Sequence, residues 1–239
     1  MPYLNITTHL DDTVDQGLLN EKGGSGFPTL FFMEPETGAV LNDWWWPEDE
    51  DKVREALKAA TAKADELKAL MAKAKAAPDD KALQAHLAIK LAMMRAADKS
   101  MEELAELAKT EGLDPALKAE FDAWYAGALV QKAYDDAAAS AESRKEFMEA
   151  AQSGFYELLK KGIRLEPGHE SAQMYYDLGL TGAITAGDKE VATVAFEGFA
   201  ATLNKIVEDN PDNTDLKGKV EGAIADAKKR LDALEETAE

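Results

Sequence analysis

From residue 50 to the end of the chain, apolar residues recur every three or four positions, and this spacing constrains the fold more than any other feature. Because an α-helix has 3.6 residues per turn, the spacing places the apolar side chains on one helix face. On the first such segment they are Val53, Leu57, Ala60, Ala64, Leu67, Met71 and Ala74. All alanines except Ala39 also lie beyond residue 50, where they favour helix. The sequence therefore predicts a long helical region.

Turn and capping residues divide this region into separate helices. Pro78 ends the first predicted helix, over 52–77, Ser100 and Glu103 have the spacing of a capping box, and Pro115 suits a first helical turn. Further helices are expected over 81–98, 101–111, 115–139, 141–162, 169–186, 188–209 and 213–236. Amphipathic helices with short connections predict antiparallel hairpins, arranged either as an open solenoid or as a closed bundle.

The first 50 residues follow a different pattern. Residues 3–8 alternate and are β-branched, which predicts a strand, and residues 11–22 predict a short helix that Gly23 and Gly24 end. Residues 29–33 form a continuous apolar run, typical of a buried strand. The turn residues 34–38 then predict a hairpin to a further strand at 39–41.

The segment from Gly26 to Val40, with its Gly-Phe-Pro-Thr step and Gly-containing hairpin, resembles the second half of the thioredoxin fold. In that family a cis-proline precedes a buried strand, a hairpin, an edge strand and a closing helix. The resemblance implies that Pro28 is the cis-proline, between Phe27 and Thr29. It also implies an α+β, mostly α chain: a truncated thioredoxin-like βαββα module over 1–77, followed by a helical hairpin domain over 78–239.

The family's redox machinery is missing from this chain, which contains no cysteine and therefore no CxxC pair. The strand that separates the two predicted parallel strands in the complete fold is missing too. Either segments 3–8 and 29–33 pair directly through a right-handed crossover, or a partner completes the sheet.

A second segment, Glu157–Pro167 followed by Tyr175–Gly179, is similar to a junction between tetratricopeptide repeats. Gly187 and Asp188, followed by Ala192 and Phe196, are similar to such a junction as well. Alternate predicted helices start further apart than the 34 residues of that repeat, so the region is expected to be tetratricopeptide-like rather than regular. Together the two resemblances imply a bacterial thioredoxin-like protein with a helical-repeat tail.

Composition narrows the range of functions. The chain carries 46 acidic and 27 basic side chains, a net charge of −19, which disfavours binding to nucleic acids and to anionic membranes. Without cysteine, and with three scattered histidines, no metal site, cofactor site or catalytic residue is expected. No apolar run approaches the roughly 20 residues that span a bilayer, and Met1–Asp12 do not resemble a signal peptide. The expected location is the cytoplasm, or the periplasm if the true start lies upstream.

The main candidate for a contact with another chain is Trp44-Trp45-Trp46. Consecutive extended residues point to opposite sides, so a small sheet cannot bury all three. These side chains are expected to lie at an interface, either within the chain or with a partner. The acidic residues Glu48–Asp51 directly precede a predicted helix, where capping of its N–H groups is expected.

The sequence thus favours a non-catalytic protein–protein interaction or scaffold subunit, built on a redox-inactive thioredoxin-like module, with a protein partner or a second copy of the chain. The alternative is the C-terminal remainder of a periplasmic thioredoxin-like disulfide oxidoreductase, whose CxxC-bearing part is missing here.

Overall fold

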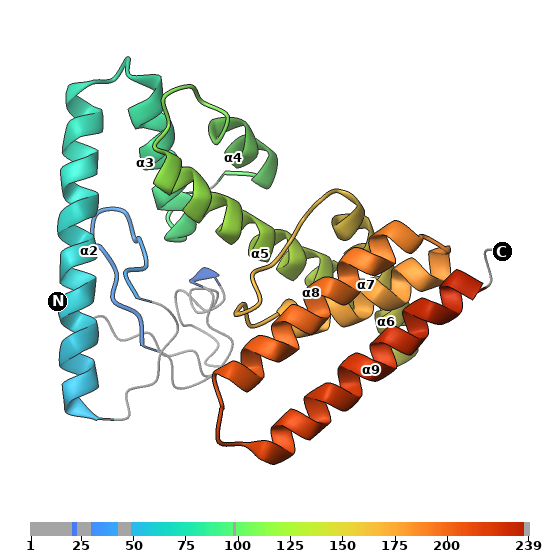
Figure 1. The fold of residues 1–239 in the computed structure, drawn as a ribbon. Coiled ribbons are helices and arrows are strands. Elements are labelled where there is room, and N and C mark those ends of the chain that lie inside the picture. Colours follow the sequence, from blue (N-terminus) through green and yellow to red (C-terminus); the bar gives the residue numbers. More distant parts are fainter. Residues whose placement is uncertain (1–20, 23–29, 43–48, 98, 237–239) are drawn as a thin grey trace. The chain divides into compact units, whose positions relative to one another are not determined.

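The computed structural model describes residues 21–22, 30–42, 49–97 and 99–236. They form eight helices (Figure 1), which are α2 (Glu50–Ala76), α3 (Lys81–Met93), α4 (Met101–Leu107), α5 (Pro115–Ser140), α6 (Arg144–Lys160), α7 (Ala172–Ala186), α8 (Lys189–Glu208) and α9 (Thr214–Glu236). The eight helices predicted beyond residue 50 are thereby confirmed, with ends that shift by a few residues.

The chain divides into two compact units, Met1–Phe121 (unit 1) and Asp122–Glu239 (unit 2). The division falls within α5. The sequence predicted a domain boundary between residues 77 and 78. That position lies between α2 and α3, which both belong to unit 1.

The predicted α+β fold class is wrong for the described residues, because they contain no β-strand. Where strands were expected at 29–33 and 39–41, the described residues form one isolated antiparallel bridge between Met33 and Val40. The outer side of the arm that contains Val40 bonds to the end of α3 and not to another strand. The N–H of Val40 donates to the carbonyl of Met94, 2.8 Å away. The βαββα module is therefore not seen. The predicted strand 3–8 and most of the predicted helix 11–22 lie outside the described residues.

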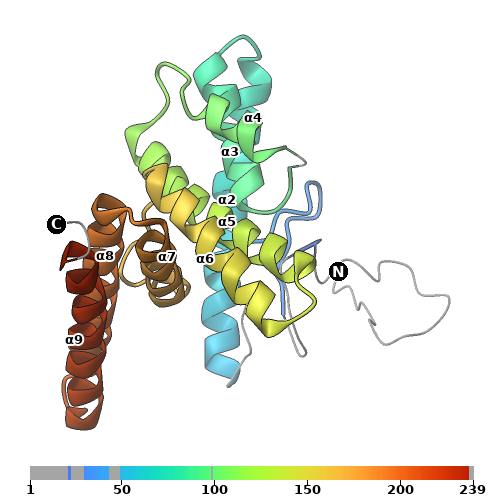
Figure 2. The same cartoon turned by 90° about the vertical axis from the view of Figure 1, so that its right-hand side faces the viewer.

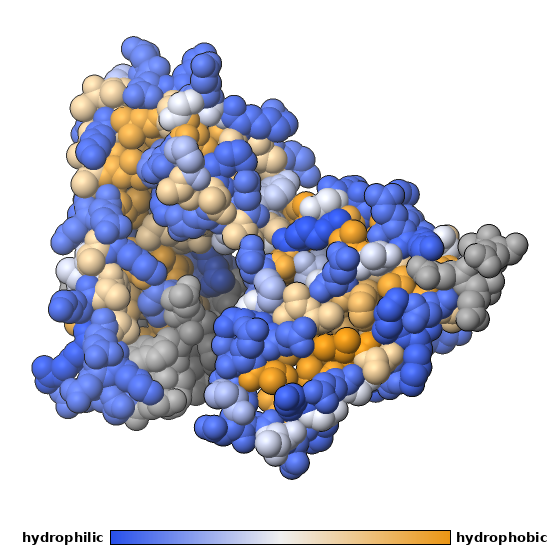
Figure 3. Space-filling view, viewed as in Figure 1, coloured by the Kyte–Doolittle hydropathy of each residue, from blue (hydrophilic) through white to orange (hydrophobic). Residues whose placement is uncertain are grey.

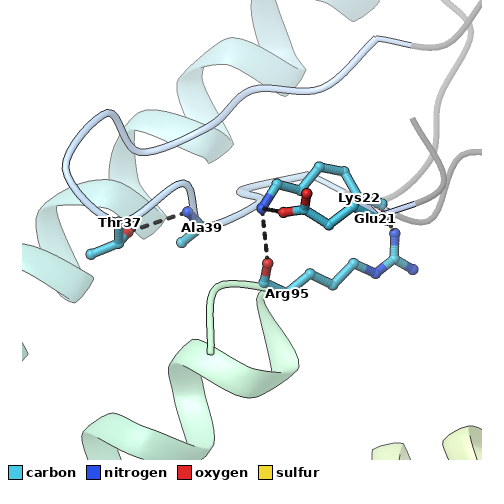
Figure 4. A network of polar contacts seen from close by, with 5 residues as sticks. All are labelled: Glu21, Lys22, Thr37, Ala39 and Arg95. Atoms are coloured by element: carbon cyan, nitrogen blue, oxygen red, sulfur yellow. Dashed lines mark hydrogen bonds and ion pairs between the residues drawn. The ribbon is translucent and has the colours of Figure 1, made fainter. Parts of the chain in front are cut away.

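Side-chain hydrogen bonds stabilise the short hairpin, which lacks a longer ladder of backbone hydrogen bonds between its two arms. Asn42 accepts a bond from the N–H of Phe32 at 2.6 Å and donates to the carbonyl of Leu30 at 2.9 Å. At the turn, Gly38 has φ of +71°, a conformation that glycine adopts without strain. Near it, the buried Lys22 donates to the carbonyl of Arg95 at 3.1 Å, and the Arg95 guanidinium donates back to the carbonyl of Lys22 (Figure 4).

Glu34 is the buried charge of this hairpin, with 1% of its surface exposed. Its Oε2 accepts bonds from the N–H of Glu36 and from both the N–H and the hydroxyl of Thr37, at 2.7 to 3.0 Å. Oε1 accepts no hydrogen bond from any residue that the structure describes. Burial by itself raises the pKa of this carboxyl, but the bonds from Thr37 and Glu36 and the positive charge of Lys68 outweigh it and lower the pKa.

In unit 1, α2 packs against α3, and α3 against α4. Asp49 caps α2 by accepting from the N–H of Lys52 at 2.8 Å, which confirms the capping expected of the acidic run. Ser100 and Glu103 form the predicted capping box of α4. At the other end of α2, the side-chain amide of Gln84 donates to the carbonyls of Ala74 and Ala77, so an α3 side chain satisfies carbonyls that the helix leaves unpaired.

In unit 2, α6, α7, α8 and α9 lie side by side in chain order (Figure 2). The second half of α5 packs on α6, where the rings of Tyr134 and Phe147 meet edge to face at 5.1 Å. Alternate helices also touch, α6 with α8 and α7 with α9, whereas α6 and α9 are not a packed pair in the described part. The helices therefore stack as an open array of hairpins, as in a solenoid, and do not close into a bundle.

Candidate protein-binding face of the helical array

Helix α7 forms the centre of unit 2 and is the helix with the largest share of buried residues. Eight of its fifteen residues are buried against α6 and α8: Ala172, Tyr175, Tyr176, Leu178, Gly179, Leu180, Gly182 and Ala183. Among the remaining residues, Gln173, Thr185 and Ala186 are exposed, and Met174, Asp177, Thr181 and Ile184 form a partly exposed stripe. Steps of three and four residues place these side chains on one face. We call this stripe, together with Arg230 of α9, the α7–α9 face.

Arg230 joins α9 to the middle of the stripe. Its Nη1 lies 2.9 Å from Oδ1 of Asp177, and its Nη2 donates to the hydroxyl of Thr181. The Arg230 side chain is 39% exposed and that of Asp177 is 43% exposed, so water reaches the ion pair. A guanidinium has five N–H donors, and the remaining three of Arg230 have no partner among the described residues. The α7–α9 face can therefore donate further hydrogen bonds to a ligand.

Two tyrosines fix the connection that leads into α7. The hydroxyl of Tyr175 donates to the carbonyl of Ile163 at 3.0 Å. The hydroxyl of Tyr176 donates to the carbonyl of Leu165 at 2.8 Å and accepts from the N–H of the same residue at 2.9 Å. Burial raises the pKa of both phenols, so they remain protonated donors. The start of α7 is thereby tied to a defined loop.

Glycines bring the neighbouring helices unusually close to α7. A Cβ on Gly182 would lie 2.3 Å from the backbone oxygen of Gln152 in α6, and a Cβ on Gly179 would lie 2.3 Å from Leu159. On the other side, a Cβ on Gly198 of α8 would lie 2.3 Å from the Tyr176 ring. Such contacts leave no space for a methyl group. The position of α7 is therefore set by close packing on both sides.

A carboxylate fixes the turn between α7 and α8. Gly187 ends α7 in the left-handed conformation, with φ of +71°, and Asp188 follows as the cap of α8. Oδ1 of Asp188 accepts from the N–H of Val191 at 3.1 Å, and Oδ2 accepts from the Tyr156 hydroxyl of α6 at 3.0 Å. This hydrogen bond raises the pKa of Tyr156. One side chain thus links α6 to the start of α8.

The ion pair on the α7–α9 face contributes little to fold stability. Ion pairs exposed to this extent contribute about 0–1 kcal/mol, because water screens the charges and side-chain entropy is lost. The fully buried Phe155 and Tyr175, whose rings meet at 5.3 Å, belong to the packing that stabilises unit 2. Asp177, Thr181 and Arg230 can therefore exchange partners without unfolding the array.

Other parts of the described chain offer weaker candidate sites. The connection between α8 and α9 surrounds an open hollow of about 530 Å³, lined by Asp209–Asp215. Its polar side chains already stabilise helix ends, since Asn213 caps α9 and Asp209 pairs with Lys205 at 2.5 Å. No group of three His, Cys, Asp or Glu residues in the described part could hold a metal ion.

Apolar side chains also line the seam between α8 and α9 (Figure 3). Partly buried residues such as Ile206, Val207, Leu216 and Ile224 pack there against the core of unit 2. This seam is the interface of the last hairpin. The outer side of α9, by contrast, carries exposed polar residues such as Lys219 and Asp226, as expected of a helix that ends a stack.

The residues predicted from the sequence as sites lie outside the described residues. This applies to the cis-proline candidate, Phe27-Pro28-Thr29, and to the interface candidates, Trp44-Trp45-Trp46. Both remain predictions. Sequence reasoning missed Asp177, Thr181 and Arg230, although one signal was present: Asp177 and Thr181 interrupt a helix that is otherwise almost entirely apolar or small.

In comparisons with known proteins, no family model, no curated protein and no solved structure matches this chain. Within the described residues, none of the helices combines the length and apolar character that a membrane crossing requires.

Proposed function

We propose that this chain is a non-catalytic interaction protein, which binds a segment of a protein partner on the α7–α9 face. The observation that carries the proposal is the contrast within α7. The helix is fixed by buried tyrosines and close glycine contacts, yet it presents one partly exposed stripe with a polar centre and apolar ends. A rigid face loses little conformational entropy on binding, which favours affinity.

The chemistry of the face indicates the kind of segment it binds. Arg230 has donors left for a carboxylate, and guanidinium–carboxylate pairs are among the stronger hydrogen-bonded contacts. Met174 and Ile184 lie two and a half to three turns apart, at either end of the stripe. Both pack in part against the core of unit 2, and their remaining exposed surface offers apolar contacts. We infer a partner segment with an acidic side chain or a terminal carboxylate, flanked by apolar residues.

The proposal rests on unit 2 and needs no thioredoxin-like module. The alternative, a thioredoxin-like oxidoreductase, has no supporting feature among the described residues, which contain no β-strand. Open arrays of helical hairpins commonly bind extended segments along one face, which is the general physical basis for a scaffold role here.

Site-specific photocrosslinking tests the proposal. A photoreactive amino acid is placed at Met174 or Ile184 on the α7–α9 face, and at Ala225 on the exposed side of α9 as the matched control. The protein is then irradiated in cells of its natural host. We expect both face positions to capture the same protein and the control position to leave it uncaptured. Equal capture at Ala225, or no adduct at either face position in a folded protein, would refute the proposal.

A further inference from the structure

We draw no further inference here: the strongest candidate, the outer edge of the hairpin in unit 1, where the backbone N–H and C=O groups of Phe31 and Met33 make no hydrogen bond with any described residue, carries nothing because nothing in the structure shows what covers it.

Discussion

Replacing Gly182 with alanine tests the close packing that positions the proposed binding face. The new Cβ would lie 2.3 Å from the backbone oxygen of Gln152 and 3.0 Å from Cβ of Tyr156, whereas ordinary contacts begin at 3.4 Å. The obstacle is backbone and no flexible side chain can move away, so α6 and α7 must separate by roughly 1 Å.

The expected magnitude follows from two opposing terms. Alanine in a helix interior is favoured over glycine by about 0.5–1 kcal/mol. Overpacking of a close-packed interior costs about 1–3 kcal/mol, and a backbone obstacle places this site at the upper end. We therefore expect Gly182→Ala to lower the free energy of unfolding by about 2 kcal/mol.

Gly222 of α9 provides the matched control, because it is also helical but exposed, with nothing within 4 Å of an added Cβ. Gly222→Ala should raise the free energy of unfolding by about 0.5–1 kcal/mol. Urea denaturation followed by circular dichroism, together with hydrogen exchange of the α7 amides, measures both variants. If Gly182→Ala is as stable as the wild type, α6 and α7 do not approach each other this closely at Gly182.

Three further substitutions test other parts of the structure. Phe155→Ala removes a fully buried ring that packs on Tyr175, and urea denaturation should show a loss of about 3–5 kcal/mol; a loss below about 1 kcal/mol would contradict this burial. Asp188→Ala removes the cap of α8, with an expected loss of about 1 kcal/mol, and an ultraviolet titration should show a lower pKa for Tyr156; an unchanged pKa would exclude the bond between these side chains. Folding lowers the pKa of the Glu34 carboxyl below its ordinary value of 4.5. The ionised carboxylate therefore stabilises the fold fully at pH values above 4.5, and this stabilisation is lost as the pH falls through the lower pKa of the folded state. Glu34→Gln should therefore weaken hydrogen-exchange protection of the Thr37 and Leu41 amides at neutral pH, with a difference from wild type that shrinks in acid; a difference independent of pH would contradict this role.

The helices could be predicted because their signals are local. Apolar spacing, Pro115 and the Ser100 capping box each act within a turn of the helix that they specify. The remaining errors at helix ends also have local causes. Helix α6 starts at Arg144 rather than near residue 141, because Ser143 caps it by accepting from the N–H of Glu146.

The hairpin was harder to predict, because an apolar run does not specify its hydrogen-bond partners. Residues 30–33 have the composition of a strand, but the N–H of Val40 bonds to Met94 at the end of a helix more than 50 residues later. The α7–α9 face was missed for a similar reason. Asp177 and Arg230 are 53 residues apart in the sequence, and the stacking of α9 beside α7 brings them together.

The central claim is that the α7–α9 face holds the partner, and affinity measurements on two single-charge variants test it most directly. Arg230→Gln removes one positive charge from the face, and Lys219→Gln removes the same charge from the exposed outer side of α9. Binding of the protein captured by photocrosslinking is then measured by titration calorimetry. We predict that Arg230→Gln weakens binding about tenfold or more, because a buried partner carboxylate loses its hydrogen-bond donors, while Lys219→Gln leaves the affinity unchanged. Equal effects of the two variants, or no effect of Arg230→Gln, would contradict the claim.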